Sequence, residues 1–202
     1  ELAEFVCRSG DLYSRAEGRR IDALDGIRAQ EVLRERRKNK YTQYSSEVAF
    51  KHDFTLANEE TTLSGRADGL LITQKGCVLE EYKACGKFPV QPNQVDVGQL
   101  MIYGAMLAMR SELSITALKL IYVEADTFEE KCFSYEFDNS ELKQMLAFML
   151  LCFDLRRRRH WHRTAERHSW LAHKKFPYPD FRFGQRALAG RVYEAVENGE
   201  RL

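Results

Sequence analysis

The sequence predicts an α/β protein with a mixed β-sheet and helices on both faces. Helix-like and strand-like segments alternate along 202 residues, and a hydrophobic share of 44% is enough to build a core. No apolar run approaches the roughly 20 residues needed to cross a bilayer. A net charge of +1 excludes an overall electrostatic preference for polyanions, so any such binding must come from local patches.

The first half of the chain is expected to form one helix followed by three strands. Apolar residues at helical spacing among Arg and Glu predict an amphipathic helix over residues 20–38. Strands are expected at 44–55, 61–73 and 77–84. The short Gln74-Lys75-Gly76 segment predicts a tight turn between the last two strands.

The second half adds further helices and strands. Two prolines, Pro89 and Pro92, end the third strand and precede a helix from about 94 to 110. Two more strands and a long helix are then expected at 114–123, 131–137 and 139 to about 160. This order of elements is typical of a mixed sheet covered by helices on both sides.

Two carboxylates and a lysine form the most informative pattern in the chain. Asp68 lies in Gly-Arg-Ala-Asp-Gly at the start of an apolar strand, and Glu81 follows the apolar run 77–79. The tight turn between these strands should bring Asp68 and Glu81 close together. Glu81 and Lys83 are two residues apart and therefore project from the same face of their strand. Two carboxylates that hold Mg²⁺ beside an ammonium group indicate a phosphodiesterase site.

The chain contains two further Glu-x-Lys triplets, which indicate no site. The triplet at 129–131 lies in a charged cluster typical of a solvated turn. The triplet at 141–143 lies in the first turn of a predicted helix, where acidic residues suit the helix dipole. Only Glu81-Tyr82-Lys83 ends an apolar strand, so we place the site there.

The order of these motifs resembles the PD-(D/E)XK nuclease superfamily, and in particular its RecB-like branch. The resemblance covers roughly residues 20–125 and implies a restriction-endonuclease-like mixed β-sheet flanked by helices. It implies that Asp68, Glu81 and the backbone carbonyl of Tyr82 hold Mg²⁺ or Mn²⁺. Lys83 would then act at the attacking water.

The helix that follows Glu-x-Lys carries Gln-x-x-x-Tyr, as in the same family. Asp96, Gln99 and Tyr103 share one face of this helix by their i, i+3 and i+7 spacing. The resemblance implies that Gln99 and Tyr103 lie on the substrate side of the site and contribute to catalysis. A polar border to a buried helix is the alternative interpretation of these two residues.

One position departs from the family pattern. RecB-like nucleases usually carry a metal-binding His four residues after a Gly in the first helix, and here Gly26 is followed by Gln30. A Gln carbonyl ligates a hard cation without contributing charge, so we expect weak metal binding, a need for millimolar Mg²⁺ and a preference for Mn²⁺. Glu47, in the first strand, is a second substitute ligand. The alternative function is a catalytically weakened DNA-binding accessory domain of a helicase.

Five cysteines, an odd and scattered set, predict free thiols in a reducing cytoplasm. Some relatives in the resembling family bind an iron–sulfur cluster through one upstream Cys and a closely spaced trio. The spacing of Cys132 and Cys152, with no C-x-x-C, argues against such a cluster here. We therefore expect no iron–sulfur cofactor.

One dense basic run offers a nucleic-acid contact. Residues 156–163 read Arg-Arg-Arg-Arg-His-Trp-His-Arg. We assign phosphate contacts to Arg156, Arg159 and Arg163 and base stacking to Trp161. A solvated helix end with cations near the C-terminal dipole is the alternative.

The end of the chain resembles the entry to the motor of XPD/DinG-like helicases. Phe-Pro-Tyr-Pro-Asp-Phe-Arg-Phe-Gly-Gln, over 176–185, precedes an amphipathic helix, and the resemblance implies that Arg182 and Gln185 would contact a nucleotide base in a complete motor. No G-x-x-x-x-G-K-[ST] phosphate loop occurs in the chain. We therefore expect a nuclease domain over 1–175 and the start of a truncated helicase motor over 176–202. A C-terminal helix packed on the nuclease is the alternative.

These patterns together predict a metal-dependent deoxyribonuclease of DNA repair or replication. Exonuclease action is favoured over endonuclease action, and a structure-specific resolvase is a further alternative. The expected partners are single-stranded or tailed duplex DNA and a helicase motor in the same chain, with no membrane partner. The expected location is the cytoplasm, at the bacterial nucleoid.

Overall fold

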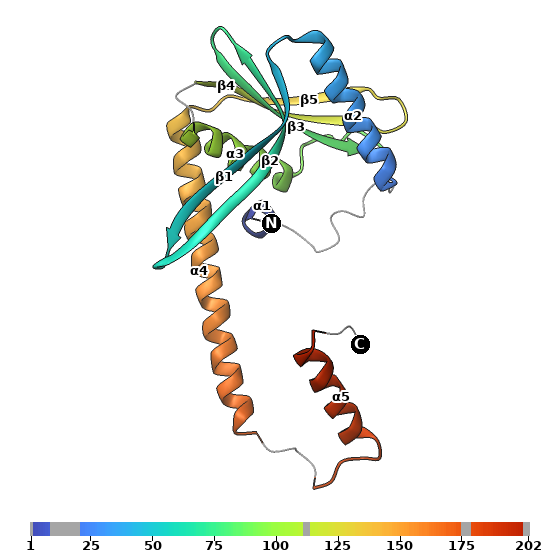
Figure 1. Cartoon of the computed structure of the whole chain (residues 1–202), viewed down its shortest axis with the longest axis vertical. Helices are drawn as coiled ribbons and strands as arrows, with labels where there is room; N and C mark the ends of the chain where they lie inside the picture. Colours follow the sequence, from blue (N-terminus) through green and yellow to red (C-terminus); the bar gives the residue numbers. More distant parts are fainter. Residues whose placement is uncertain (1, 9–20, 111–113, 175–178, 200–202) are drawn as a thin grey trace. The chain divides into compact units, whose positions relative to one another are not determined.

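The computed structural model describes residues 2–8, 21–110, 114–174 and 179–199 (Figure 1). The chain divides into two compact units, Glu1–Arg158 and Arg159–Leu202. This division falls inside one long helix, earlier than the expected domain boundary at 175/176, and residues 175–178 lie outside the described part. Within the described residues, no helix combines the length and hydrophobicity needed to span a membrane.

A five-stranded mixed sheet forms the centre of the first unit. Its strands are β1 (Tyr44–Leu56), β2 (Glu59–Thr73), β3 (Gly76–Cys85), β4 (Ile115–Glu124) and β5 (Glu130–Tyr135). The strands lie in sequence order, and each neighbouring pair is antiparallel except β3 and β4. The β3–β4 pair is parallel because a helical crossover separates the two strands in sequence.

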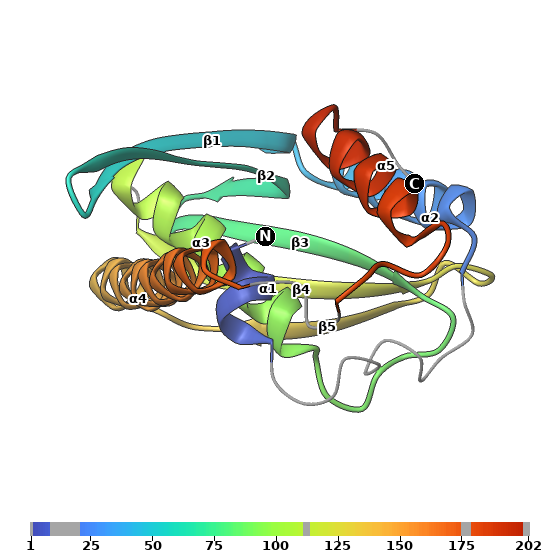
Figure 2. The same cartoon turned by 90° about the horizontal axis from the view of Figure 1, so that it is seen from below.

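Helices cover both faces of this sheet (Figures 1 and 2). The helices of the first unit are α1 (Leu2–Cys7), α2 (Ala23–Lys40), α3 (Gln94–Arg110) and the first part of α4 (Asn139–Ala172), whereas α5 (Gln185–Glu197) belongs to the second unit. On one face, α2 packs Ala29 and Leu33 against Tyr82, Ile121 and Val123. On the other face, α1, α3 and the first half of α4 form the larger core. The predicted α/β class, a mixed sheet flanked by helices, is confirmed, and it is consistent with a restriction-endonuclease-like fold.

The central position of β3 follows from its composition. Residues 76–82 are all buried, because one face of the strand meets α2 and the other meets α3. A strand covered on both faces reads as a continuous apolar run instead of an alternating one. The two glutamates at its end, Glu80 and Glu81, are therefore carried into the interior on opposite faces.

Helix α1 packs closely against α3 at Gly98. A Cβ atom added at Gly98 would lie 2.5 Å from the Cys7 sulfur and 3.1 Å from its Cβ. Glycine at this position therefore lets the two helices meet. Phe5 secures the same helix from the other side, because its ring packs edge-on against Phe153 and under the Arg156 guanidinium.

We predict that Gly98→Ala lowers the free energy of unfolding by about 1–3 kcal/mol, because the added methyl group forces α1 away from α3. The matched control is Gly26→Ala on α2, where an added Cβ meets only Ala84 at an ordinary 3.6 Å. That control should be neutral or stabilising, since Ala favours helix over Gly. Urea denaturation of the two variants checks this, and equal stabilities would contradict it.

Candidate active site

The site is built where β2 leaves β3. The ladder between these strands runs from Thr73↔Gly76 to Gly69↔Glu80 and then ends. Beyond it, the Asp68 carboxylate accepts the Tyr82 backbone N–H at 2.8 Å through Oδ2. Gln30 on α2 donates its amide to the Tyr82 carbonyl at 3.1 Å. Two side chains therefore satisfy the Tyr82 backbone in place of a neighbouring strand.

Glu81 lies beside Asp68 and is almost fully buried, with 3% of its surface exposed. Its Oε1 accepts a hydrogen bond from the Lys83 ammonium at 2.9 Å, which confirms that the two side chains share a face of β3. Its Oε2 is buried and has no hydrogen-bond partner among the described residues. A buried carboxylate oxygen without a partner is costly unless a proton or a cation meets it.

Burial and charge set the protonation of this pair. Desolvation raises the Glu81 pKa to about 7, with Lys83 opposing the rise and Asp68 adding to it. Burial alone would lower the Lys83 pKa, but the neighbouring Glu81, Asp96 and Asp68 carboxylates raise it above its ordinary value. Lys83 is therefore a cation at neutral pH and acts as a hydrogen-bond donor, not as a base.

Four of the five predicted catalytic residues, Glu81, Lys83, Gln99 and Tyr103, form one hydrogen-bonded chain, and Asp68 lies beside Glu81. Lys83 donates to Gln99 Oε1 at 2.9 Å, and Gln99 donates to the Tyr103 hydroxyl at 3.0 Å. The i, i+4 spacing of Gln99 and Tyr103 on α3 places both over the end of β3. The structure thus brings Asp68, Glu81, Lys83, Gln99 and Tyr103 together, as the sequence predicts.

The two glycines of Gly-Arg-Ala-Asp-Gly make room for tyrosine rings of the site. A Cβ atom at Gly65 would collide with the Tyr103 ring, and one at Gly69 would lie 2.5 Å from the Tyr44 hydroxyl oxygen. Tyr44 in turn donates to the Asp68 carbonyl at 3.4 Å. These glycines therefore serve close packing around the acidic residue between them.

Sequence reasoning left Asp96 without a role at the site. Its Oδ1 lies 4.0 Å from the Lys83 ammonium, and its Oδ2 accepts the Tyr122 hydroxyl at 2.8 Å. The i, i+3 and i+7 spacing of Asp96, Gln99 and Tyr103 on α3 already indicated that Asp96 lies on the same face as the other two. Asp96 is a second negative charge that holds Lys83 protonated.

Arg34 is the residue that sequence reasoning missed altogether. Its Nη2 lies 2.7 Å from Asp68 Oδ1, and its Nη1 lies 3.6 Å from Glu47 Oε1. Burial would lower the Arg34 pKa, but these two carboxylates raise it. In the sequence, Arg34 lies one helical turn after Gln30, and this spacing indicates that both residues lie on the same face of α2.

The donor set fits a hard divalent cation in part. Glu81 Oε2 is a buried oxygen that lacks a partner, and Asp68 lies next to it. The other expected ligands are engaged: the Tyr82 carbonyl by Gln30, and Glu47 by Arg34 and, at 3.7 Å, by Arg66. Among the described residues, no group of three or more His, Cys, Asp or Glu side chains is arranged to hold a metal ion.

A small cavity lies beside this chain of residues. It measures about 210 Å³ and is bounded by Lys83, Gln99 and Tyr103 on one side. Residues Leu2 and Glu4 of α1 form part of its wall. Any substrate group that reaches Lys83 through this cavity must therefore fit between α1 and α3.

A buried network on the opposite face of β3 supports the site from behind. Glu80 accepts the Tyr82 hydroxyl at 2.7 Å and lies 3.2 Å from the Arg37 Nε. The Tyr82 and Tyr44 hydroxyls lie 2.7 Å apart, and Arg37 also reaches Glu130 at 2.6 Å. These contacts neutralise the buried Glu80 and hold α2 on the sheet.

The basic run lies within α4, where its residues have different roles. Arg156 donates to the Phe5 carbonyl at 2.6 Å, so its guanidinium anchors α1. Arg159 and Arg163 are exposed and share a face by their i, i+4 spacing, whereas Trp161 is rotated about 200° from Arg159. The structure therefore keeps only Arg159 and Arg163 of the four predicted contacts on one exposed surface.

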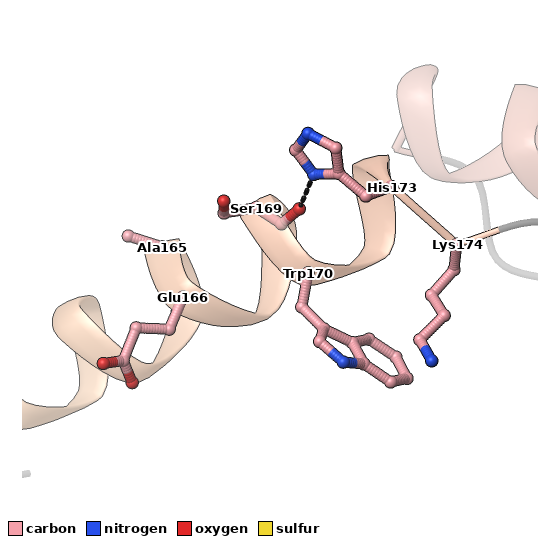
Figure 3. Close-up of a pocket in the computed structure, with 6 residues that line it drawn as sticks. All are labelled: Ala165, Glu166, Ser169, Trp170, His173 and Lys174. Carbon is pink, nitrogen blue, oxygen red and sulfur yellow. Dashed lines mark hydrogen bonds between the residues drawn. The ribbon is translucent and has the colours of Figure 1, made fainter.

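Another tryptophan shares the face of Arg159 and Arg163. Trp170 is eleven residues after Arg159, which is about three helical turns. Figure 3 shows Trp170 near the end of α4 and Lys174 just beyond that end, with their side chains on the same side. The Lys174 ammonium lies 4.2 Å from the centre of the Trp170 ring. Trp170 is 59% exposed.

Residues Arg182 and Gln185 bind each other at the start of α5. The Gln185 side chain accepts the Arg182 backbone N–H at 2.8 Å, and the Gln185 N–H donates to the Arg182 carbonyl at 3.0 Å. On this helix, Leu188, Val192 and Val196 are exposed. The rest of the helicase-like motif, residues 176–178, lies outside the described residues.

Comparison with known proteins adds little to this geometry. No protein-family model and no curated protein matches the chain. Among solved structures it is similar to a protein described as "Crystal structure of SSO0001", with a TM-score of 0.47 and 17% identity over 64% of this chain. The match covers 60% of the length of that protein.

We predict that Glu81→Gln removes a pH dependence of stability. The Glu81 pKa is about 7 in the folded protein and near 4.5 in the unfolded chain, so the folded state holds the proton more tightly. This stabilisation is complete below about pH 4.5 and is lost as the pH rises through 7, by up to about 3 kcal/mol.

Urea denaturation from about pH 5 to pH 8 tests this. Wild type should lose stability relative to Glu81→Gln across that range, because only the wild-type side chain must ionise in the interior. Parallel stability curves for the two proteins would contradict the assigned burial of Glu81.

Proposed function

We propose that this chain is a Mg²⁺- or Mn²⁺-dependent nuclease that hydrolyses phosphodiester bonds in DNA. The observation that carries the proposal is the single cluster formed by Asp68, Glu81, Lys83 and Gln99 at the end of β3. Two acids, one cation and an amide donor, partly buried and beside a cavity, suit attack on a phosphate.

Lys83, Gln99 and Tyr103 would have different roles in the reaction. Lys83 is held protonated by Glu81 and Asp96, and with two of its N–H groups bonded to Glu81 and Gln99, the third can donate to an attacking water or to a phosphate oxygen. Gln99 accepts from Lys83 and donates to Tyr103, which fixes the direction of the ammonium. Tyr103 is further restrained by stacking on Phe50. The polar groups are therefore oriented before substrate arrives.

Asp68 and Glu81 are the residues that would hold the divalent ion. Such an ion would supply Lewis-acid stabilisation of the charge that develops on the phosphate. Glu81 must be ionised to contribute, and its pKa of about 7 in the metal-free protein means that ion binding near neutral pH would release part of a proton. Asp68 stays in place through its bond to the Tyr82 amide.

The resemblances in the sequence extend the proposal to a biological setting. We propose a role in DNA repair or replication, with exonuclease action favoured, on single-stranded or tailed DNA in the bacterial cytoplasm. We also propose that residues 176–202 begin a helicase motor in a longer protein. Exposed Leu188, Val192 and Val196 support this, since they suit packing against further elements.

A specific observation favours one alternative function. Arg34 occupies an oxygen of Asp68, and Gln30 occupies the Tyr82 carbonyl. Both positions would be ligands in an active site of this kind. A DNA-binding accessory domain without catalysis is therefore the second candidate, and it predicts no Glu81-dependent binding of Mn²⁺ in titration calorimetry.

We predict that Lys83→Ala lowers the rate of DNA cleavage by at least about a hundredfold, because the ammonium that faces the phosphate is lost. End-labelled single-stranded, duplex and flap DNA with Mg²⁺ or Mn²⁺ are the substrates. Lys143→Ala is the matched control, because it removes an exposed lysine from another Glu-x-Lys triplet. Cleavage by Lys83→Ala at the wild-type rate would refute the site.

We predict that the double variant Arg159→Glu, Arg163→Glu weakens binding of single-stranded DNA and reduces its salt dependence. Two lost phosphate contacts should lower the slope of log affinity against log salt by about 1.4. Fluorescence anisotropy with a labelled oligonucleotide measures both effects. The control, Arg186→Glu with Arg191→Glu on α5, changes net charge equally, so an equal loss in both would indicate a purely global charge effect.

A further inference from the structure

Arg34 is the only cation within direct contact of Asp68 among the described residues. Its guanidinium binds Asp68 Oδ1 at 2.7 Å and approaches Glu47 at 3.6 Å. With 17% of its side chain exposed, Arg34 is held inside the site and not on the surface. It therefore occupies the side of Asp68 that Tyr82 leaves free.

The strands present two acids to this one guanidinium. The β1–β2 ladder pairs Ser46↔Gly69 and Val48↔Ala67 but omits Glu47 and Asp68 between them. Glu47 has a φ of 55°, in the left-handed region, so β1 is distorted at this point. Two neighbouring carboxylates repel each other unless a cation lies between them.

The fit of Arg34 to this place is incomplete. Its Nε is buried and has no hydrogen-bond partner among the described residues. Glu81 Oε2, on the other side of Asp68, is unsatisfied in the same way. A site that leaves one buried donor and one buried acceptor unmet has not reached its most stable set of contacts.

We propose that Arg34 is an internal counter-cation that competes with the divalent ion for Asp68. In the metal-free chain its guanidinium neutralises Asp68 and Glu47. To bind, the ion must displace the guanidinium from Asp68 Oδ1, since two cations at one oxygen repel each other. This inference rests on the proposed metal-dependent function and adds a regulatory residue to it.

Displacement of the Arg34 guanidinium from Asp68 would change which polar groups of the site have a partner. Asp68 and the Glu81 oxygen that lacks a partner would hold the ion, and the freed guanidinium, with its Nε now unbonded, would be available to water or to a phosphate. Because Arg34 competes with the ion for Asp68, it lowers the affinity of the site for the metal. When metal is scarce, Arg34 neutralises Asp68 and Glu47, so their mutual repulsion does not destabilise the folded protein.

The test compares Mn²⁺ binding to wild type, Arg34→Met and Arg34→Lys by titration calorimetry. Arg34→Met keeps much of the aliphatic stem but removes the competing charge, so the Kd for Mn²⁺ should fall by at least about tenfold. Arg34→Lys keeps the charge without the planar fork and should lie between the two. Arg36→Met is the control, because Arg36 lies on the same helix but binds Glu130 and the Phe128 carbonyl.

Each outcome separates this inference from the nuclease proposal. Wild-type binding that depends on Glu81, with no tighter binding by Arg34→Met, overturns the role of Arg34 alone. Weaker binding by Arg34→Met also overturns it, because Arg34 would then support the metal ligands. Absence of Glu81-dependent binding in every protein overturns both proposals.

A second measurement needs no variant, in case Arg34→Met does not fold. In ¹⁵N-labelled wild type, Mg²⁺ should shift the Arg34 Nε–H signal and speed its exchange with water, while the Arg36 signal stays in place. A signal of Arg34 that is unchanged at saturating Mg²⁺ would overturn the proposal.

Discussion

The bond between the Asp68 carboxylate and the Tyr82 amide decides the geometry of the site. Where β2 leaves β3, the Tyr82 N–H loses its strand partner, and a buried N–H without a partner costs about 1–3 kcal/mol. Asp68 meets that need at 2.8 Å, which fixes its distance from Glu81 and turns its other oxygen toward α2. The placement of the acidic pair is thus a consequence of backbone hydrogen bonding at the end of a ladder.

Glu80 and Glu81 are adjacent in the central strand and point to opposite faces of the sheet, so one cation cannot neutralise both. Both residues are 3% exposed. Arg37 reaches Glu80 from α2, whereas Lys83 reaches Glu81 from the same strand. On the face toward α2, Glu80 is bonded by both Tyr82 and Arg37, and these contacts help to hold α2 on the sheet. On the face toward α3, Glu81 keeps one carboxylate oxygen without a partner among the described residues, which is the physical difference between the two glutamates.

The sequence predicts most of this architecture because periodicity and turns are local properties. Strands β1 to β3 and helix α3 begin and end within about two residues of expectation. Helix α4 continues to Ala172, twelve residues past the expected end, because no Pro or Gly interrupts the polar stretch after 160. Helical spacing places Arg34 on the same face of α2 as Gln30, but its contact with Asp68 depends on how α2 lies on the sheet, which the local sequence does not determine. The same holds for Arg156, whose partner Phe5 is 151 residues away.

The sheet order also implies a sequence of events during folding. Strands β1, β2 and β3 are consecutive antiparallel neighbours, so they can pair through short loops before distant segments arrive. Asp68 and Glu81 therefore meet early, whereas Arg34 joins Asp68 across 34 residues and Gln30 joins Tyr82 across 52. Until α2 docks, Asp68 lacks the Arg34 guanidinium, and Lys83 is the cation that the acidic pair carries on its own strands. Under the metal dependence proposed above, a divalent ion would meet less competition for Asp68 at that stage than in the folded protein.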